Sequence, residues 1–148
     1  AATAQEMLSR EIAVYSARVE RYAADLRLKY ELAQRLMRAK KYDTAIQLLQ
    51  QAVRDNRIEA EVNLLLGECF LREKKGALAR RSLEKAVPKL AFDEKPDAFK
   101  RCHYMLARLY EEAKDVDAAE NHYSEVLAVD YDYKDTRDRL EKLPSSTS

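Results

Sequence analysis

Six apolar positions recur three times in this sequence with the same internal spacing. Leu32, Leu66 and Leu106 correspond, the second following the first by 34 residues and the third following the second by 40. Such a period indicates repeated units that must stack, because one unit cannot bury its apolar side alone. The other five sets are Ala33, Gly67 and Ala107; Leu36, Phe70 and Tyr110; Ala45, Ala79 and Ala119; Leu49, Leu83 and Tyr123; and Ala52, Ala86 and Val126.

Composition indicates that the units are helical. The 148-residue chain contains only two Gly and three Pro, with 47% hydrophobic and 36% charged residues. Few helix breakers and many Ala, Leu, Glu, Lys and Arg favour helices over sheets with many turns. Apolar residues also recur three and four positions apart, as at Leu8, Ile12, Tyr15 and Val19, which is typical of an amphipathic helix. We therefore expect an all-α chain that forms one domain.

Turn and capping residues divide the chain into helical hairpins. We expect Asp25 to cap the helix that follows it and Gly76 to take the left-handed conformation that ends a helix. Pro88 should end or kink one helix, and Pro96 should begin another. The predicted segments are a first helix at 6–22, hairpins at 26–57, 58–91 and 96–131, a last helix at 134–143 and a disordered tail at 144–148.

A 34-residue helix–turn–helix with these large and small positions resembles the tetratricopeptide repeat. The resemblance covers about residues 26–131, and the segment Tyr133–Leu140 looks like the solvating helix that ends such arrays. The aromatic residue usual near the start of the first helix is replaced by Lys29, Asn63 and His103, and the proline usual after the second helix is missing. The resemblance implies an all-α, right-handed α-solenoid of antiparallel hairpins with flanking helices.

In tetratricopeptide arrays the first helices of successive hairpins line a concave groove. The resemblance therefore implies a non-catalytic scaffold or adaptor that binds a protein or peptide segment of unknown identity. Tyr30, Leu64 and Tyr104 would present apolar area, while arginines would bind carboxylates. The candidate contact residues are Arg27, Tyr30, Gln34, Met37, Glu61, Leu64, Glu68, Arg72, Arg101, Tyr104 and Arg108.

One subtype of the family does not fit this sequence. Tetratricopeptide proteins that bind chaperone tails hold a terminal carboxylate with a clamp of Lys and Asn. The corresponding positions here are Tyr30, Gln34, Leu65 and Met105, and only Arg101 is basic. We therefore do not expect capture of a chaperone's acidic carboxyl terminus.

The pair Cys102-His103 is the main candidate for chemistry. A nucleophile needs a base placed beside it, whereas adjacent helical residues point in different directions, so we interpret the pair as packed side chains. A zinc site needs about four convergent ligands. The chain has two Cys and two His, and His122 lies in a different predicted helix. We expect no catalytic residue, no metal site and no cofactor.

The uneven distribution of charge along the chain supports two alternatives to a peptide-binding scaffold: self-association and nucleic-acid binding. Net charge is +1, but residues 1–41 hold nine Lys/Arg against five Asp/Glu, while residues 102–148 hold six against eleven. A basic beginning could pair head to tail with the acidic end of another copy, so the chain could be a self-associating structural or regulatory segment. Basic clusters at 35–41 and 72–81 also allow nucleic-acid binding, a less favoured reading.

No apolar run approaches the roughly 18–20 residues that span a bilayer, and no signal peptide opens the chain. We expect a cytoplasmic location and no membrane span. The chain begins Ala-Ala-Thr-Ala without Met, which is consistent with a fragment of a longer protein, and its general style is that of a bacterial sequence. Cys69 and Cys102 form no Cys-x-x-Cys pair and are expected to be small buried side chains.

Overall fold

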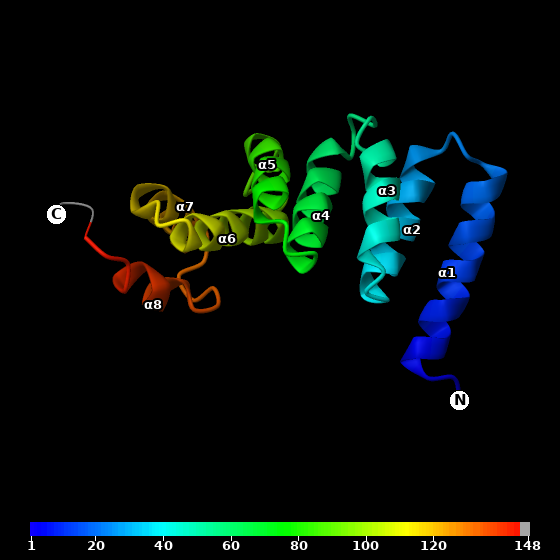
Figure 1. Cartoon of the computed structure of the whole chain (residues 1–148), viewed down its shortest axis with the longest axis horizontal. Helices are drawn as coiled ribbons and strands as arrows, with labels where there is room; N and C mark the ends of the chain where they lie inside the picture. Colours follow the sequence, from blue (N-terminus) through cyan, green and yellow to red (C-terminus); the bar gives the residue numbers. More distant parts are fainter. Residues whose placement is uncertain (146–148) are drawn as a thin grey trace. The chain divides into compact units, whose positions relative to one another are not determined.

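The computed structural model describes residues 1–145 as eight α-helices and one short 3₁₀ turn, with no strand in that range (Figure 1). The all-α fold class with helical hairpins and flanking helices is confirmed. The tail predicted for 144–148 lies, for its last three residues, outside the described part of the chain. The elements are α1 Ala4–Arg21, α2 Leu26–Arg38, α3 Tyr42–Ala52, α4 Glu59–Arg72, α5 Gly76–Ala86, η1 Val87–Lys89, α6 Pro96–Glu112, α7 Val116–Val129 and α8 Thr136–Glu141.

The chain forms two compact units. The first comprises Ala1–Ser82 and the second begins at Leu83, so the boundary lies inside α5. Helix α5 ends at Ala86, and Pro88 lies in the 3₁₀ turn that follows, as expected for a residue that lacks a backbone N–H. Pro96 is the first residue of α6, which confirms its predicted position at a helix start.

In the first unit, α2 and α3 pack together, α4 contacts both, and α1 packs on α2. No residue of α1 is fully buried, although Ile12, Tyr15 and Val19 pack against the core of the unit. Arg35 of α2 holds its guanidinium 4.1 Å from the centroid of the Tyr15 ring, a cation–π contact that joins α1 to α2. The core comprises Leu32, Ala33, Leu36, Ala45, Leu49, Ala52, Ile58, Val62, Leu65, Leu66 and Cys69.

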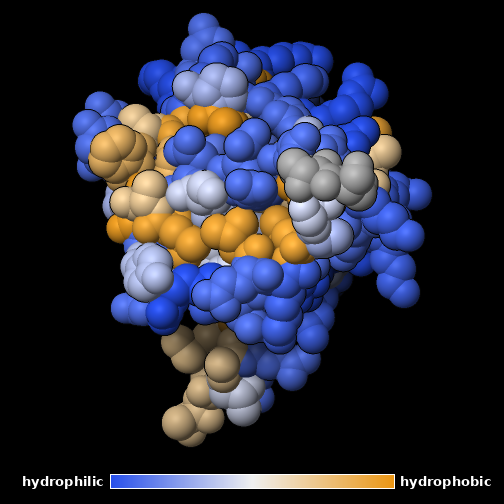
Figure 2. Space-filling view, turned by 90° about the vertical axis from the view of Figure 1, so that its left-hand side faces the viewer, coloured by the Kyte–Doolittle hydropathy of each residue, from blue (hydrophilic) through white to orange (hydrophobic). Residues whose placement is uncertain are grey.

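In the second unit, α6 and α7 form a hairpin and α8 packs on α7. Thr136, the first residue of α8, is completely buried. The Tyr104 hydroxyl of α6 donates to the Asp135 carboxylate at 2.5 Å, which ties the start of α8 to the hairpin. Figure 2 looks onto this carboxyl-terminal end and shows an apolar band with hydrophilic residues on both sides of it. The buried core of the hairpin comprises Tyr104, Ala107, Ala119, Tyr123 and Val126.

The repeated positions of the sequence are interior positions of the fold. Five of the six sets are buried in all three copies, as the spacing predicts. The exception is the set of Leu36, Phe70 and Tyr110, in which only Leu36 is buried. Alanine or glycine at the small positions leaves room for the helices of a hairpin to approach closely.

Each of the three hairpin turns contains a lysine in the left-handed conformation. Lys40, Lys74 and Lys114 have φ values of 61°, 60° and 63°. In each turn the N–H of the next residue donates to a carbonyl five positions earlier, as in the 2.8 Å bond from Lys75 to Phe70. This pattern is a Schellman motif. The expectation for Gly76 is wrong, because the geometry places the left-handed residue two positions earlier and Gly76 begins α5.

The helices that follow these turns differ in their caps. The Asp115 carboxylate accepts the N–H of Ala118 at 3.2 Å and caps α7. Lys41 occupies the same position before α3 and provides no side-chain hydrogen bond. Asp25 caps α2 by accepting the N–H of Leu28 at 3.1 Å, as predicted.

Candidate interaction surfaces

The central helix α4 is buried on almost every side. Eight of its fourteen residues are buried, including Leu64 at 2% exposure. Glu61, Glu68 and Arg72 lie on one remaining side at helical spacing; the two glutamates are half-buried and the arginine is exposed. Glu61, Glu68 and Arg72 therefore form a charged strip on α4, while Glu59, Phe70 and Leu71 are also half-buried.

Helix α2 contacts α4 within the same unit. Of the four predicted contact residues on α2, Arg27 is exposed and Gln34 is half-buried. Tyr30 and Met37 pack against the core of the unit and leave only part of their surface accessible. We call Arg27, Tyr30, Gln34, Met37, Glu61, Glu68 and Arg72 the α2/α4 surface.

Two predicted contact residues are interior. Leu64 is buried in α4, and Tyr104 is 8% exposed. The Tyr104 ring is covered by the segment that leads to α8: the centroid of its ring lies 5.7 Å from that of Tyr133. Neither side chain presents the apolar area that the sequence suggested. Tyr104 is buried because the segment before α8 packs over α6.

Arg101 and Arg108 belong to the second unit. Arg101 is exposed and Arg108 is half-buried on α6. The predicted α2 and α4 residues thus lie in the first unit on two helices that contact each other, while the α6 residues lie in the second unit.

The Cys102 side chain is unsuited to act as a nucleophile. It is completely buried, and its thiol donates to the carbonyl oxygen of Leu83 at 3.4 Å. Burial raises the pKa of Cys102 to about 12, with a smaller effect from Glu84. The thiol therefore stays protonated at neutral pH, and only the thiolate is nucleophilic.

The two histidines meet between α6 and α7. The Nδ1 atoms of His103 and His122 lie 2.9 Å apart, and the centroid of the His103 ring is 4.4 Å from that of Phe99. Burial, and then the neighbouring His122, lower the pKa of His103 to about 4. Burial also lowers the pKa of His122. Both rings are therefore neutral at physiological pH.

Polar and aromatic groups surround the histidine pair. The His122 ring stacks on Tyr110 at 5.6 Å between centroids and 3° between planes, and the Tyr110 hydroxyl donates to the Glu84 carboxylate. Among residues 1–145 no group of three or more His, Cys, Asp or Glu side chains is arranged to hold a metal ion. The pair acts in packing, with one hydrogen bond between its rings.

The sequence contained a signal for this pair. Asn63 and Ser82 precede His103 and His122 by the same 40-residue step, and both are buried. Extending the repeat alignment to this second-helix position would therefore have paired the histidines.

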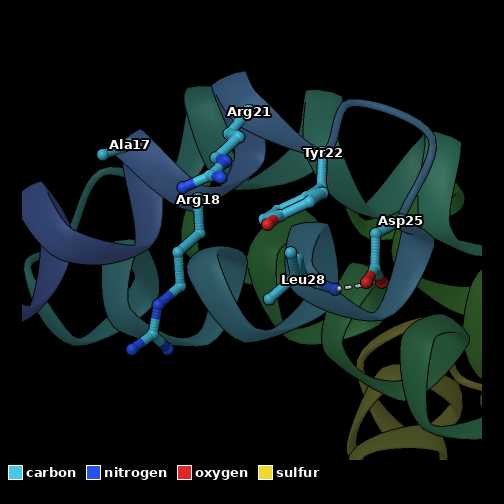
Figure 3. A pocket seen from close by; sticks show the side chains of 6 residues that line it. All are labelled: Ala17, Arg18, Arg21, Tyr22, Asp25 and Leu28. Atoms are coloured by element: carbon cyan, nitrogen blue, oxygen red, sulfur yellow. Dashed lines mark hydrogen bonds between the residues drawn. The ribbon is translucent and has the colours of Figure 1, made fainter.

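A recess between the end of α1 and the start of α2 was not predicted. It has a volume of about 560 Å³ and lies in the first unit (Figure 3). Figure 3 shows the Tyr22 ring between the two arginine side chains and Leu28, with its hydroxyl directed toward the arginines. The available sequence signal was Arg18, Arg21 and Tyr22 gathered at the end of one helix. The lining residues are Ala17, Arg18, Arg21, Tyr22, Asp25 and Leu28.

Across residues 1–145, none of the helices combines the length and apolar character that a membrane crossing requires.

Comparison with known proteins identifies the fold. The sequence model of a family described as tetratricopeptide repeat matches residues 30–98. A crystal structure of MamA is similar, with a TM-score of 0.77 and 16% identity over 90% of this chain and 74% of that chain. Residues 30–98 therefore match the tetratricopeptide repeat family, and the chain has the fold of tetratricopeptide proteins.

Two further solved tetratricopeptide structures agree. A second MamA crystal structure has a TM-score of 0.78 and 15% identity over 92% of this chain and 71% of that one. The first tetratricopeptide repeat domain of Spaghetti (RPAP3), bound to the HSP90 peptide SRMEEVD, has a TM-score of 0.67 and 16% identity over 81% of this chain and 90% of that one. At these identities the likeness concerns the fold. No curated protein sequence matches the chain.

The tetratricopeptide pattern continues beyond the matched residues. The family match ends at residue 98, near the start of α6. The α6–α7 hairpin is nevertheless buried at five of the six repeated positions, and these five are buried in both hairpins before it. Lys114 also has the same turn conformation as Lys40 and Lys74. The α6–α7 hairpin therefore repeats the local packing and turn geometry of the two hairpins before it.

Proposed function

We propose that this tetratricopeptide protein is a non-catalytic interaction module that binds a partner protein or peptide on the α2/α4 surface. The observation that carries the proposal is the central helix α4, which is mostly buried and keeps Glu61, Glu68 and Arg72 at least partly accessible on one side. A helix that is otherwise interior and keeps a charged strip accessible is well placed to present that strip to a ligand. The likeness to a domain bound to a peptide supports this use of the fold.

The chemistry of the surface suits a segment with mixed charge. Arg27 and Arg72 offer planar guanidinium groups that can bind carboxylates through two parallel hydrogen bonds. Glu61 and Glu68 favour a cation between them, and Tyr30 adds partly exposed aromatic area. A terminal-carboxylate clamp is not part of the proposal, because Leu65 is buried at 9% exposure and Met105 is half-buried.

A non-catalytic role is supported by the state of the reactive side chains. The thiols of Cys69 and Cys102 are buried, and burial raises the pKa of each to about 12. His103 is buried against Phe99 and His122. These groups are removed from any substrate in solution, so recognition is the function that the accessible residues serve.

Site-specific photocrosslinking tests the surface directly. A photoreactive amino acid replaces Glu68 in one variant and Arg54, an exposed residue after α3, in a control variant. We expect a discrete partner segment to crosslink at position 68 and not at position 54, and mass spectrometry would identify it. Equal crosslinking at both positions would remove the α2/α4 surface from consideration, and a nuclease-sensitive product would identify nucleic acid as the ligand.

Charge reversal provides an independent measurement. The pair Glu68→Arg and Arg72→Glu keeps the net charge, as does the control pair Asp43→Arg and Arg54→Glu on exposed residues of the same unit. Binding of the identified segment should weaken at least about tenfold for the first pair, which corresponds to about 1.4 kcal/mol. The control pair should bind like the wild type.

A second candidate function is self-association, which the charge asymmetry favours. Residues 1–41 carry nine basic against five acidic residues, and residues 102–148 carry six against eleven. The basic part of one copy can attract the acidic part of another copy, which favours association between copies.

A further inference from the structure

The recess between α1 and α2 holds two arginines that lack an acidic partner. The Arg18 guanidinium lies 5.0 Å from the centroid of the Tyr15 ring, and the Arg21 guanidinium lies 5.3 Å from that of Tyr22. Within residues 1–145 neither guanidinium forms an ion pair with a carboxylate, in contrast to Arg35, which contacts Glu31 at 2.7 Å. Contact with a ring restricts where each guanidinium lies while leaving its N–H donors available.

The other lining groups favour an anionic ligand with apolar area beside it. Figure 3 shows the Tyr22 hydroxyl directed toward the arginines, and Tyr22 is 52% exposed. Ala17 and Leu28 supply apolar surface. The Asp25 carboxylate also lines the recess and accepts the N–H of Leu28, and the two arginines outweigh its single negative charge. Two guanidinium groups and one hydroxyl therefore offer hydrogen bonds that suit carboxylates.

Helix α7 of the second unit presents the complementary charge. It contains no Lys or Arg, and its inner side buries Ala119, Tyr123 and Val126. Asp117, Glu120 and Glu125 are exposed on its outer side, where Asn121, Ser124 and Ala128 are also exposed. In the described part of the chain none of the three carboxylates forms an ion pair. We call Asp117, Glu120 and Glu125 with these neighbours the outer face of α7.

We propose that the recess docks the outer face of α7 of a second copy of this chain, so that copies join head to tail. Carboxylates spaced three residues apart on a helix, such as Asp117 and Glu120, lie side by side and can meet the two arginines together. The recess and the outer face of α7 are different patches, so the contact is heterologous and leaves one of each patch free. Copies therefore add in series. This inference rests on the second candidate function, self-association, and is independent of ligand binding at the α2/α4 surface.

The contact depends on salt, because both patches are solvent-exposed. Screening reduces the range of exposed charges from about 10 Å at about 0.1 M salt to about 3 Å at about 1 M salt. Sedimentation velocity of the whole chain over a wide range of concentration should show a mass that rises with concentration at the lower salt and returns to that of one copy at the higher salt. A single copy at every concentration and both salts would overturn the proposal.

A charge-swap experiment locates the contact. The variant Arg18→Glu/Arg21→Glu and the variant Asp117→Lys/Glu120→Lys should each remain monomeric, because each places like charges on both patches. An equimolar mixture should associate again, because each variant then meets an opposite charge on the other. Failure of the mixture to associate would overturn the pairing of these two patches.

Two controls separate the site from a general effect of charge or folding. The pair Arg10→Glu and Arg54→Glu changes net charge by the same amount at exposed residues outside the recess, and it should associate like the wild type. Equal loss of association in this control would overturn the assignment to the recess. Circular dichroism would show that each variant is folded, and Arg18→Gln/Arg21→Gln replaces the glutamate variant if that one is not.

Discussion

The Nδ1 atoms of His103 and His122 lie 2.9 Å apart where α6 packs on α7. At this distance one Nδ1 donates and the other accepts, so the two rings cannot both carry a proton on Nδ1. Burial opposes protonation of either ring, and protonation of both rings is also opposed by repulsion between the two positive charges. Protonation of these rings at low pH should therefore destabilise the third hairpin.

Stability should fall as the pH drops from about 6.5 to about 4. The pKa of His103 is lowered from 6.5 to about 4 in the folded chain, so the unfolded chain binds more protons across this window. The loss is on the order of 3 kcal/mol in the free energy of unfolding. Urea unfolding at a series of pH values would measure it.

The variant His103→Phe is the matched comparison for this effect. Its stability should depend less on pH over the same window, because Asp and Glu titrate in both proteins while the histidine pair exists only in the wild type. Parallel pH dependence of the two proteins would contradict the assignment. The charged and titratable groups that face the pair are Glu84 from α5, Tyr110 from α6 and Glu125 from α7.

Replacing Lys74 by glycine should stabilise the chain. Lys74 has a φ of 60°, a conformation in which a Cβ atom is unfavourable and glycine is not. Lys74→Gly should therefore be more stable than Lys74→Ala by about 0.5–1 kcal/mol. Thermal unfolding of both variants would check this, and equal stabilities would show that the turn tolerates a side chain without strain.

Replacing Lys41 by aspartate should also stabilise the chain. Lys41 precedes α3 and makes no capping hydrogen bond, whereas Asp115 at the equivalent position caps α7. Lys41→Asp supplies an acceptor and removes a positive charge from the helix amino terminus, for a gain of about 1 kcal/mol. Lys41→Ala removes the charge alone and should gain less. The denaturant midpoint is the measurement, and identical midpoints would exclude a new cap.

Enlarging Gly67 should disrupt the first unit. Gly67 is buried in α4 at the position equivalent to Ala33 and Ala107, which are completely buried. Gly67→Leu adds volume where helices approach closely and should cost about 1–3 kcal/mol or unfold the unit. Gly67→Ala should be neutral or stabilising by up to about 1 kcal/mol, because alanine occupies the same position in the other two hairpins and favours helix. Circular dichroism melts would compare them, and a stable Gly67→Leu variant would contradict the packing argument.

The interior was predictable from the sequence because burial imposes a period. Ala33, Ala45 and Leu49 have counterparts in all three hairpins, and a residue type that recurs at every copy reports a shared packing requirement. The turn was harder to predict. We predicted the left-handed conformation for Gly76 because glycine adopts it easily. The hydrogen bonds of the Schellman motif instead require that conformation at Lys74, which is the second residue after α4 ends.

The candidate surfaces were less predictable because they depend on what the rest of the chain covers. Tyr104 is on the expected helix, but the segment before α8 packs on its ring. The repeat in the sequence does not include that segment, so it could not predict the contact. Arg18 and Arg21 fall outside the repeats, so an alignment of repeats gave them no role, although the recess between α1 and α2 includes both.

The histidine pair also makes the third hairpin observable on its own. The chain contains two histidines and no tryptophan, so every imidazole resonance in its proton NMR spectrum originates at the contact of α6 with α7. Titration, partner binding or unfolding that reaches this hairpin must move those few signals, and an event confined to the first unit should leave them in place. A spectrum of natural, unlabelled protein can therefore report which of the two units responds.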